Sequence, residues 1–310
     1  MIFWNRKERL EQLQEGVYAD QQEQLQRLAE ESYLRTIIRR FCRHRLGVGS
    51  VFVLLFLLLL ALFGPLLSPY AYDALVGRPN SAPSWQHLLG TDQIGRDVLS
   101  RLFTGLRISL FVGFMATFIS PLIGVLLGLI SAYFGKVIDQ LLMRFTDMVM
   151  SFPYLLLVLV AAAVFKPGLW NIILILGFVD WPGVARLVRG NVLSLRAQTF
   201  VQSSLVAGLP RRYILFSDIL PNTTAPILIY ASTVMALSIL DEAALSFLSL
   251  GVQPPVPSLG NMLGGAQSLT VLPSRPWLWL PPGLCIILLV VSINFIGDAL
   301  RDAFDPKSQI

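Results

Sequence analysis

The chain has 310 residues, of which 55% are hydrophobic and only 14% are charged, and its formal net charge is +5. A typical soluble protein is about 25% charged, so this chain has too few polar groups to cover a water-soluble core. The composition excludes a disordered chain, a collagen-like chain and a disulfide scaffold, and it favours a multi-span membrane protein. Two cysteines and two histidines offer no metal-ligand spacing and no histidine-based triad. We therefore predict no catalytic residue and no metal site.

Long charge-free stretches predict the membrane-spanning helices, each of which needs about 20 mostly apolar residues. Six such helices are expected, at about 48–68, 108–134, 146–165, 168–187, 222–243 and 278–298. The fourth is the weakest, because Asp180 and Pro182 interrupt its apolar run. The first apolar run starts too far from the N-terminus to be a cleavable signal peptide, so we expect an anchor. The sequence thus predicts an all-α polytopic membrane protein, with one transmembrane domain over residues 46–310.

The distribution of basic residues predicts the orientation, because Lys and Arg concentrate on the cytoplasmic side. With the N-terminus inside, the inner segments carry 18 Lys and Arg residues and the outer segments carry 6. Both termini are therefore expected in the cytoplasm. Residues 1–45 would form a cytoplasmic tail, either as an amphipathic helix on the membrane surface or as a solvated helix. Contact with the lipid bilayer explains the positive charge, and we expect no nucleic-acid partner.

Small residues recur at four-residue spacing in the second predicted helix. They are Ala116, Ser120, Gly124, Gly128 and Ala132. This spacing places them on one helix face, where they allow another helix to approach closely. Tight packing within one bundle and an interface between subunits are both open interpretations.

The predicted cytoplasmic loop at 188–221 is too long for a simple turn. Gly208 and Pro210 predict a short helix, a break in direction, and a second helix that enters the membrane with Pro221 near its start. A structured loop of this kind indicates a contact with a partner.

This loop resembles the EAA loop of bacterial ABC importer permeases. That pattern is Glu-Ala-Ala, three residues, Gly, nine residues, Ile, any residue, and Leu-Pro. The residues here that stand at its positions are Gln202, Ser203, Ser204, Gly208, Leu220 and Pro221. Two positions depart from the pattern, since Asp218 replaces the Ile and Gln202 replaces the acidic residue. Gln202 keeps its hydrogen-bonding capacity but lacks the negative charge.

A second segment, at 90–101, resembles the external signature of the C-type permease in peptide and nickel importers. Its candidate site residues are Gly90, Thr91, Asp92, Gly95, Arg96, Asp97 and Arg101. Asp97 and Arg101 are four residues apart, a spacing that favours an ion pair on one helix face. The segment would be either a cap that contacts the binding protein or gates the pore, or a self-neutralised structural element.

Further blocks of the same family follow in order, at 143–147, 151–153, 185–190, 242–248 and 297–302. The chain thus resembles the C-type permease of the dipeptide, oligopeptide and nickel ABC importers over roughly residues 46–307. The resemblance implies the type I importer permease fold and the bacterial inner membrane. It also implies three kinds of partner: a B-type permease in a heterodimer, two ABC ATPases, and an extracytoplasmic solute-binding protein.

Nucleotide chemistry is expected to belong to the partners. The chain has no Gly-x4-Gly-Lys-Ser/Thr motif, which cradles ATP phosphates in P-loop proteins. We therefore expect no enzyme activity and no cofactor in this chain, with ATP and Mg used by the ATPase subunits. ATPase closure would push the 188–221 loop and rock the helices between two open states.

Three of the acidic residues within the predicted helices or at their ends are candidates for a pore or gate. Intramembrane carboxylates usually face a cavity or a partner, so Asp180 would either line the pore or lie at the interface, paired locally near Arg186. Asp241 and Glu242 would lie at a gate, brace a loop or be exposed at the boundary.

The leading functional hypothesis is a peptide importer permease. A nickel-chelate importer permease of the same family is the first alternative. A proton-coupled secondary transporter that uses Asp180 is a weaker one, because no inverted repeat is visible. A membrane enzyme comes third, since no nucleophile–base pair is visible.

Overall fold

The computed structural model describes residues 35–267 and 271–304, without the side chains of residues 211, 271 and 272. Within these residues the regular structure is helical, apart from two isolated β-bridges. Residues 35–43 are helical. Residues 1–34 of the predicted 1–45 tail, which include the start of its proposed amphipathic helix, lie outside the described residues.

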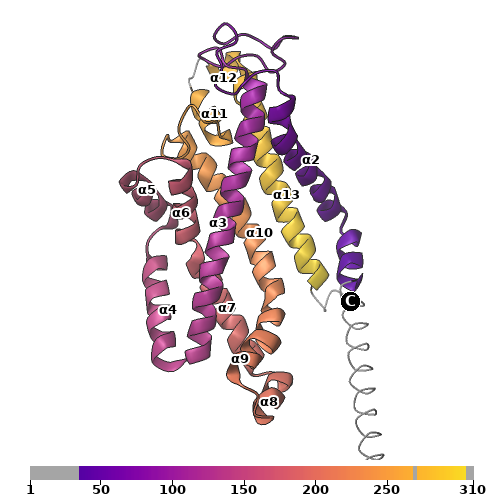
Figure 1. Ribbon diagram of the computed structural model, residues 1–310, viewed down its shortest axis with the longest axis vertical. Helices are drawn as coiled ribbons and strands as arrows, with labels where there is room; N and C mark the ends of the chain where they lie inside the picture. The colour runs from indigo at the N-terminus through magenta and orange to yellow at the C-terminus, as the bar shows by residue number, and fades with distance from the viewer. Residues whose placement is uncertain (1–34, 268–270, 305–310) are drawn as a thin grey trace, which may run out of the picture.

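Five helical segments in the described part are long and apolar enough to cross a membrane. They are α2 (Arg45–Leu67), α3 (Val98–Phe134), the consecutive α6 (Leu169–Val179) and α7 (Trp181–Arg196), α10 (Leu220–Phe247) and α13 (Leu280–Phe304). They form an elongated bundle with α3 near its centre (Figure 1). The predicted all-α membrane fold is therefore confirmed.

A sixth crossing is made only if two sharply bent helices are taken together. α4 (Lys136–Ser151) and α5 (Tyr154–Val164) meet at 85°. Phe152 has extended backbone angles, φ −83° and ψ 141°, as expected for a residue that precedes proline. The predicted helix at 146–165 is therefore divided in two, because the Phe152-Pro153 pair ends α4 and α5 begins at Tyr154.

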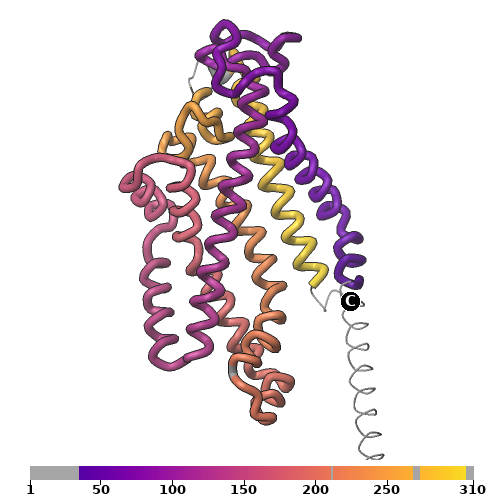
Figure 2. Tube along the Cα trace, in the orientation of Figure 1, coloured from indigo at the N-terminus to yellow at the C-terminus, as the bar shows by residue number. Residues whose placement is uncertain are grey.

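The two ends of the bundle carry the non-spanning elements. In the view of Figure 1 the upper end holds residues 68–97, α11 (Leu259–Gly265) and α12 (Val271–Ser274), followed by the 3-10 turn η2 (Pro276–Leu278). The lower end holds α8 (Thr199–Val206) and α9 (Arg211–Tyr213), and the π-helix η1 (Ile214–Ile219) leads from there into α10. The same path can be followed along the backbone in Figure 2.

α3 is longer than the charge-free stretch from which it was predicted. It begins at Val98, not at 108, and has 37 residues. Arg101 and Arg107 lie in its first turns, where Arg101 is buried and Arg107 is exposed. Charges at the end of a helix thus made the predicted span too short.

α3 also contributes to all four apolar clusters of the described core, three of which lie along the bundle below its first turn. Leu106 packs with residues of α2, α10 and α13, Ala116 with residues of α5 and α6, and Leu129 with residues of α7 and η1. The last cluster includes Val201 of α8. The lower loop is therefore attached to the same central helix as the rest of the bundle.

The small-residue face of α3 is buried along its whole length. A Cβ atom added to Gly128 would lie 2.7 Å from the carbonyl oxygen of Ala185 and 2.9 Å from Cβ of Val188. Both neighbours belong to α7 of the same chain. At this position the four-residue stripe therefore serves packing within one bundle.

Gly128→Leu is expected to force α3 and α7 apart and to lower the free energy of unfolding by about 1–3 kcal/mol, the usual cost of overpacking. Thermal unfolding of the detergent-purified protein measures it. Gly190→Leu is the matched control, because Gly190 lies on α7 with open space around its Cβ position. Equal melting temperatures for the two variants would contradict the close approach of the helices.

Candidate functional site

The predicted contact residues of the lower loop lie on α8. The side-chain amide of Gln202 donates to the carbonyl oxygen of Arg196 at 2.7 Å, which holds α8 against the end of α7. The hydroxyls of Ser203 and Ser204 donate to carbonyl oxygens one turn earlier in α8. Gln202 and Ser203 are exposed and Ser204 is half-buried.

α8 has one buried anchor and an exposed apolar surface. Val201 is fully buried among residues of α3 and α7. Val206 is 89% exposed, and Phe200 and Leu205 are also exposed. α8 projects at the lower end of the bundle (Figure 1). Exposed apolar side chains beside a rigid anchor suit contact with another protein.

Gly208 provides the change of direction that the sequence predicts. Its φ is +73°, in the left-handed region that glycine adopts without steric cost. The chain then passes through Pro210 into α9 and η1. Leu220 and Pro221 open α10, with the proline in its first turn. The expected order of short helix, break and membrane-entering helix is therefore present.

The acidic and basic residues of the upper segment neutralise one another. The guanidinium of Arg96 lies 2.7 Å from the carboxylate of Asp92, and that of Arg101 lies 3.5 Å from it. Asp97 instead caps α3, since its carboxylate accepts from the backbone N–H of Ser100 at 2.8 Å. It also hydrogen-bonds His87 at 2.9 Å. The predicted Asp97–Arg101 pair is therefore wrong, because Asp97 precedes the first helical turn and folds back over it.

The remaining signature residues hold this segment against residues 75–81. Gly90 and Gly95 have φ values of +72° and +91°. Thr91 is fully buried, and its hydroxyl accepts from the backbone N–H of Ser81 at 2.8 Å and donates to the carbonyl of Arg78. These contacts favour the interpretation of the segment as a self-neutralised structural element.

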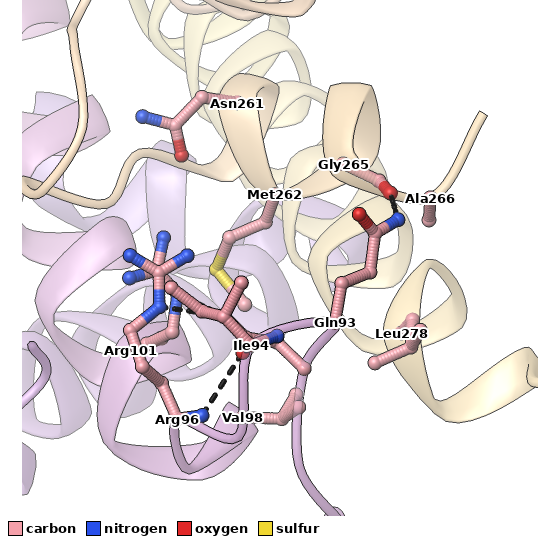
Figure 3. A pocket seen from close by; sticks show the side chains of 11 residues that line it. Gln93, Ile94, Arg96, Val98, Arg101, Asn261, Met262, Gly265, Ala266 and Leu278 are labelled. Carbon is pink, nitrogen blue, oxygen red and sulfur yellow. Dashed lines mark hydrogen bonds and ion pairs between the residues drawn. The ribbon is translucent and has the colours of Figure 1, made fainter. Parts of the chain in front are cut away.

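A small cavity of about 110 Å³ lies between this segment and α11. Asp92, Arg96 and Arg101 line one side, and Asn261 and Met262 of α11 line another. Figure 3 shows Gln93 reaching from the segment to the backbone oxygen of Gly265, a hydrogen bond that ties the two walls together.

Asp97→Ala is expected to lower the free energy of unfolding by about 1–2 kcal/mol, because α3 loses its N-cap and buried His87 loses its partner. A lower melting temperature of the purified protein tests this. Asp73→Ala in the same segment is the control, since Asp73 is exposed. The assigned role of Asp97 fails if both variants melt at the same temperature.

Glu242 lies inside the bundle and is fully buried. Its carboxylate accepts from the hydroxyl of Ser109 on α3 at 2.6 Å and from that of Ser246 on α10 at 2.7 Å. Those hydroxyls in turn accept from the backbone N–H groups of Leu259 and Val252. Glu242 therefore braces the segment between α10 and α11 against α3.

Asp180 lies at a cavity of about 400 Å³ formed by α10, the α4–α5 bend and the α6–α7 junction. Asp180 and Tyr230 line this cavity together with Tyr154. The phenol of Tyr154 donates to the carboxylate of Asp241 at 2.8 Å. The interpretation of Asp180 as locally paired is wrong, because Arg186 donates to Asp147 on α4 at 2.6 Å instead.

Sequence reasoning missed His87, Tyr154, Tyr230 and the ion pair between Asp139 and Arg189 at 2.5 Å. His87 is 8% exposed, and nothing in its sequence surroundings indicates its partner. The two tyrosines did carry a signal, since a phenol inside an apolar helix needs a hydrogen-bond partner.

The fold is a helical membrane bundle with a projecting loop helix, and comparison with known proteins defines its class. Residues 124–310 match the family model described as the binding-protein-dependent transport system inner membrane component. The chain belongs to this family. It is thus a permease subunit, a multi-pass protein of the inner membrane that works with partner ATPase and transmembrane subunits.

More particular similarity comes from a second family model and from relatives that span most of the chain. Residues 32–87 match the N-terminal transmembrane domain of oligopeptide transport permease C. A putative peptide permease protein of Brucella suis biovar 1 is 42% identical over 87% of this chain and 90% of its own length. The oligopeptide transport system permease protein OppC of Haemophilus influenzae is 39% identical over 94% of both chains.

A solved structure shares the fold. It is a chain of the MetNI methionine ABC transporter in an inward-facing conformation, with a TM-score of 0.53 and 18% identity. The match covers 66% of this chain and 96% of that chain.

Proposed function

We propose that this chain is the C-type permease of an ATP-driven importer for di- or oligopeptides. It would pair with a B-type permease and receive solute from an extracytoplasmic binding protein. The observation that carries the proposal is its 39% identity to an oligopeptide permease protein over 94% of both chains. The C-terminal match to the permease family and the N-terminal match to oligopeptide permease C support it.

In this proposal the lower end of the bundle faces the cytoplasm, as do both termini. The excess of Lys and Arg in the segments assigned to the inside supports this orientation. Two partner ATPases would bind ATP and Mg and perform the hydrolysis, while this chain performs no catalysis. α8 would be the contact for one ATPase, through its exposed residues Phe200, Leu205 and Val206.

The packing of α8 supports a route by which a displacement of this helix by an ATPase would reach the membrane-spanning helices. Val201 is buried in one cluster with Leu129 of α3 and Val192 of α7. Protein interiors are closely packed and transmit displacement, so a shift of α8 would move the lower ends of α3 and α7. Two ion pairs, Asp139–Arg189 and Asp147–Arg186, join α4 to α7, so α4 would move together with α7.

The decisive experiment is reconstitution of the complete importer in liposomes with the binding protein and a radiolabelled tripeptide. We expect uptake to require internal ATP and the binding protein, and ATP hydrolysis to rise when both peptide and binding protein are present. Peptide uptake driven by a proton gradient without the ATPases would overturn the proposal.

A further inference from the structure

The cavity beside Asp180 is a largely apolar chamber within the membrane-spanning part, with a few polar side chains in its wall. It has about 400 Å³ and is lined by residues of α4, α5, α6, α7 and α10. Asp180 lies at the junction of α6 and α7, and Asp241 is linked to the cavity wall through its 2.8 Å hydrogen bond with Tyr154. Neither the lower loop nor the upper segment contributes to its lining.

The acidic groups of this chamber have no cationic partner among the described residues. The Oδ2 atom of Asp180 is buried without a hydrogen-bond partner, and Asp180 also interacts electrostatically with the nearby Asp241. The residues that line the cavity include no Lys, Arg or His. An unpaired carboxylate in a membrane protein is costly and marks a functional site by default. A cation supplied from outside the chain would provide the partner that Asp180 lacks.

The walls favour an organic ammonium group over a metal ion. Calcium takes six to eight oxygen ligands, and the described residues contain no group of three or more His, Cys, Asp or Glu that could hold a metal. Aromatic rings attract ammonium groups through their faces, and Phe152, Tyr154 and Tyr230 all line this cavity. Phe152 is 55% exposed, so the cavity is open on that side.

Tyr230 is held in place by a close contact. A Cβ atom at Gly183 would collide with the Tyr230 phenol oxygen, so the ring lies directly against α7. Tyr154 is held by Asp241. The phenol of Tyr154 is thus held by Asp241, and that of Tyr230 lies against α7, before any solute arrives. Such preorganisation reduces the entropic cost of binding.

We propose that Asp180 and Asp241, with Tyr154 and Tyr230, form a binding site for the ammonium group of the transported solute. The inference rests on the proposed function, because a peptide carries such a group at its amino terminus and on lysine side chains. Asp180 contacts the ammonium, Asp241 adds a second negative charge, and the phenol rings surround the cation.

Charge-selective labelling tests the site without any transport. Met150→Cys places a thiol at the cavity, since Met150 lines it and is exposed. Cys42 and Cys285 are first replaced by serine, and the complete importer is treated with cationic or anionic methanethiosulfonate reagents. We expect the cationic reagent to react faster, and Asp180→Asn to lower the ratio of the two rates about tenfold.

Asp298→Asn is the matched control for the labelling, because Asp298 is an exposed carboxylate on α13. It should leave the ratio unchanged. A ratio that Asp180→Asn does not alter, or that Asp298→Asn alters equally, overturns the proposal.

Uptake by the reconstituted importer identifies the source of the ammonium. Asp180→Asn and Asp241→Asn should each slow transport about tenfold, as expected for loss of a charged hydrogen bond, while the complexes still hydrolyse ATP. Slower uptake of both Ala-Ala-Ala and Ala-Lys-Ala indicates the amino terminus, whereas an effect on Ala-Lys-Ala alone indicates the lysine side chain. Uptake of both peptides at the wild-type rate overturns the proposal.

If the wild-type importer moves neither peptide, the proposed function fails. The labelling ratio still decides whether the chamber attracts cations.

Discussion

Glu242→Ala is expected to lower the free energy of unfolding by about 3 kcal/mol. Glu242 is fully buried and accepts hydrogen bonds from Ser109 and Ser246. Its removal leaves two buried hydroxyls without acceptors, at about 1–3 kcal/mol each, and also leaves a void. The melting temperature of the detergent-purified protein measures the effect.

Glu242→Gln separates the hydrogen bonds from the volume of the side chain. The glutamine fills the same space, but its NH₂ group faces a hydroxyl that already accepts from a backbone N–H. We expect it to melt between the wild type and Glu242→Ala. Ala244→Gly on the exposed side of α10 should cost only about 1 kcal/mol. A Glu242→Ala protein that is no less stable than Ala244→Gly contradicts the bracing role.

Gly208→Val is expected to uncouple ATP hydrolysis from uptake in the reconstituted importer, with at least a tenfold loss of uptake per ATP hydrolysed. The φ of +73° at Gly208 is a genuine outlier for a β-branched residue. No atom of this chain lies within 4 Å of the added Cβ, so within this chain the expected effect comes from the backbone. The valine would redirect the turn and move α8 away from its partner.

Gly208→Asn is the informative companion, because asparagine tolerates the left-handed conformation better than other side chains. Gly208→Asn should retain most of the coupling, although it also adds a side chain to the turn. Parallel assays of peptide uptake and phosphate release give the ratio. If valine and asparagine uncouple equally, side-chain bulk and not backbone conformation is responsible, and the proposed role of the turn fails.

Composition predicted the fold class well because a membrane span is a local property. A stretch of apolar residues crosses the bilayer whatever its neighbours are, so charge-free stretches placed the helices. The predicted helix boundaries were wrong where charged residues lie inside a helix. Arg101 is an example, because it belongs to α3 and is buried beside Asp92. Pro153 is a local sequence signal for the α4–α5 bend. The prediction missed the bend because it considered only the absence of charged residues.

The contacts of the site residues could not be read in the same way. His87 and Asp97 are ten residues apart, and Ser109 and Glu242 are 133 apart. Such pairs depend on how loops and helices meet in three dimensions. The rule for pairs four residues apart holds inside a helix, and it misled at Asp97 because that residue stands just before the helix. The lower loop was easier, since its helix, glycine turn and proline are consecutive.

The length of α3 means that a small tilt of this helix displaces its two ends by several ångströms. Its 37 residues extend about 55 Å at 1.5 Å per residue, against about 30 Å for the hydrocarbon layer. One end carries the Asp97 cap and the other packs near α8. A tilt of 10° about its midpoint would displace the two ends by about 5 Å in opposite directions. Two distance probes, one at each end of α3, would therefore measure displacements that result from the same tilt on both sides of the membrane.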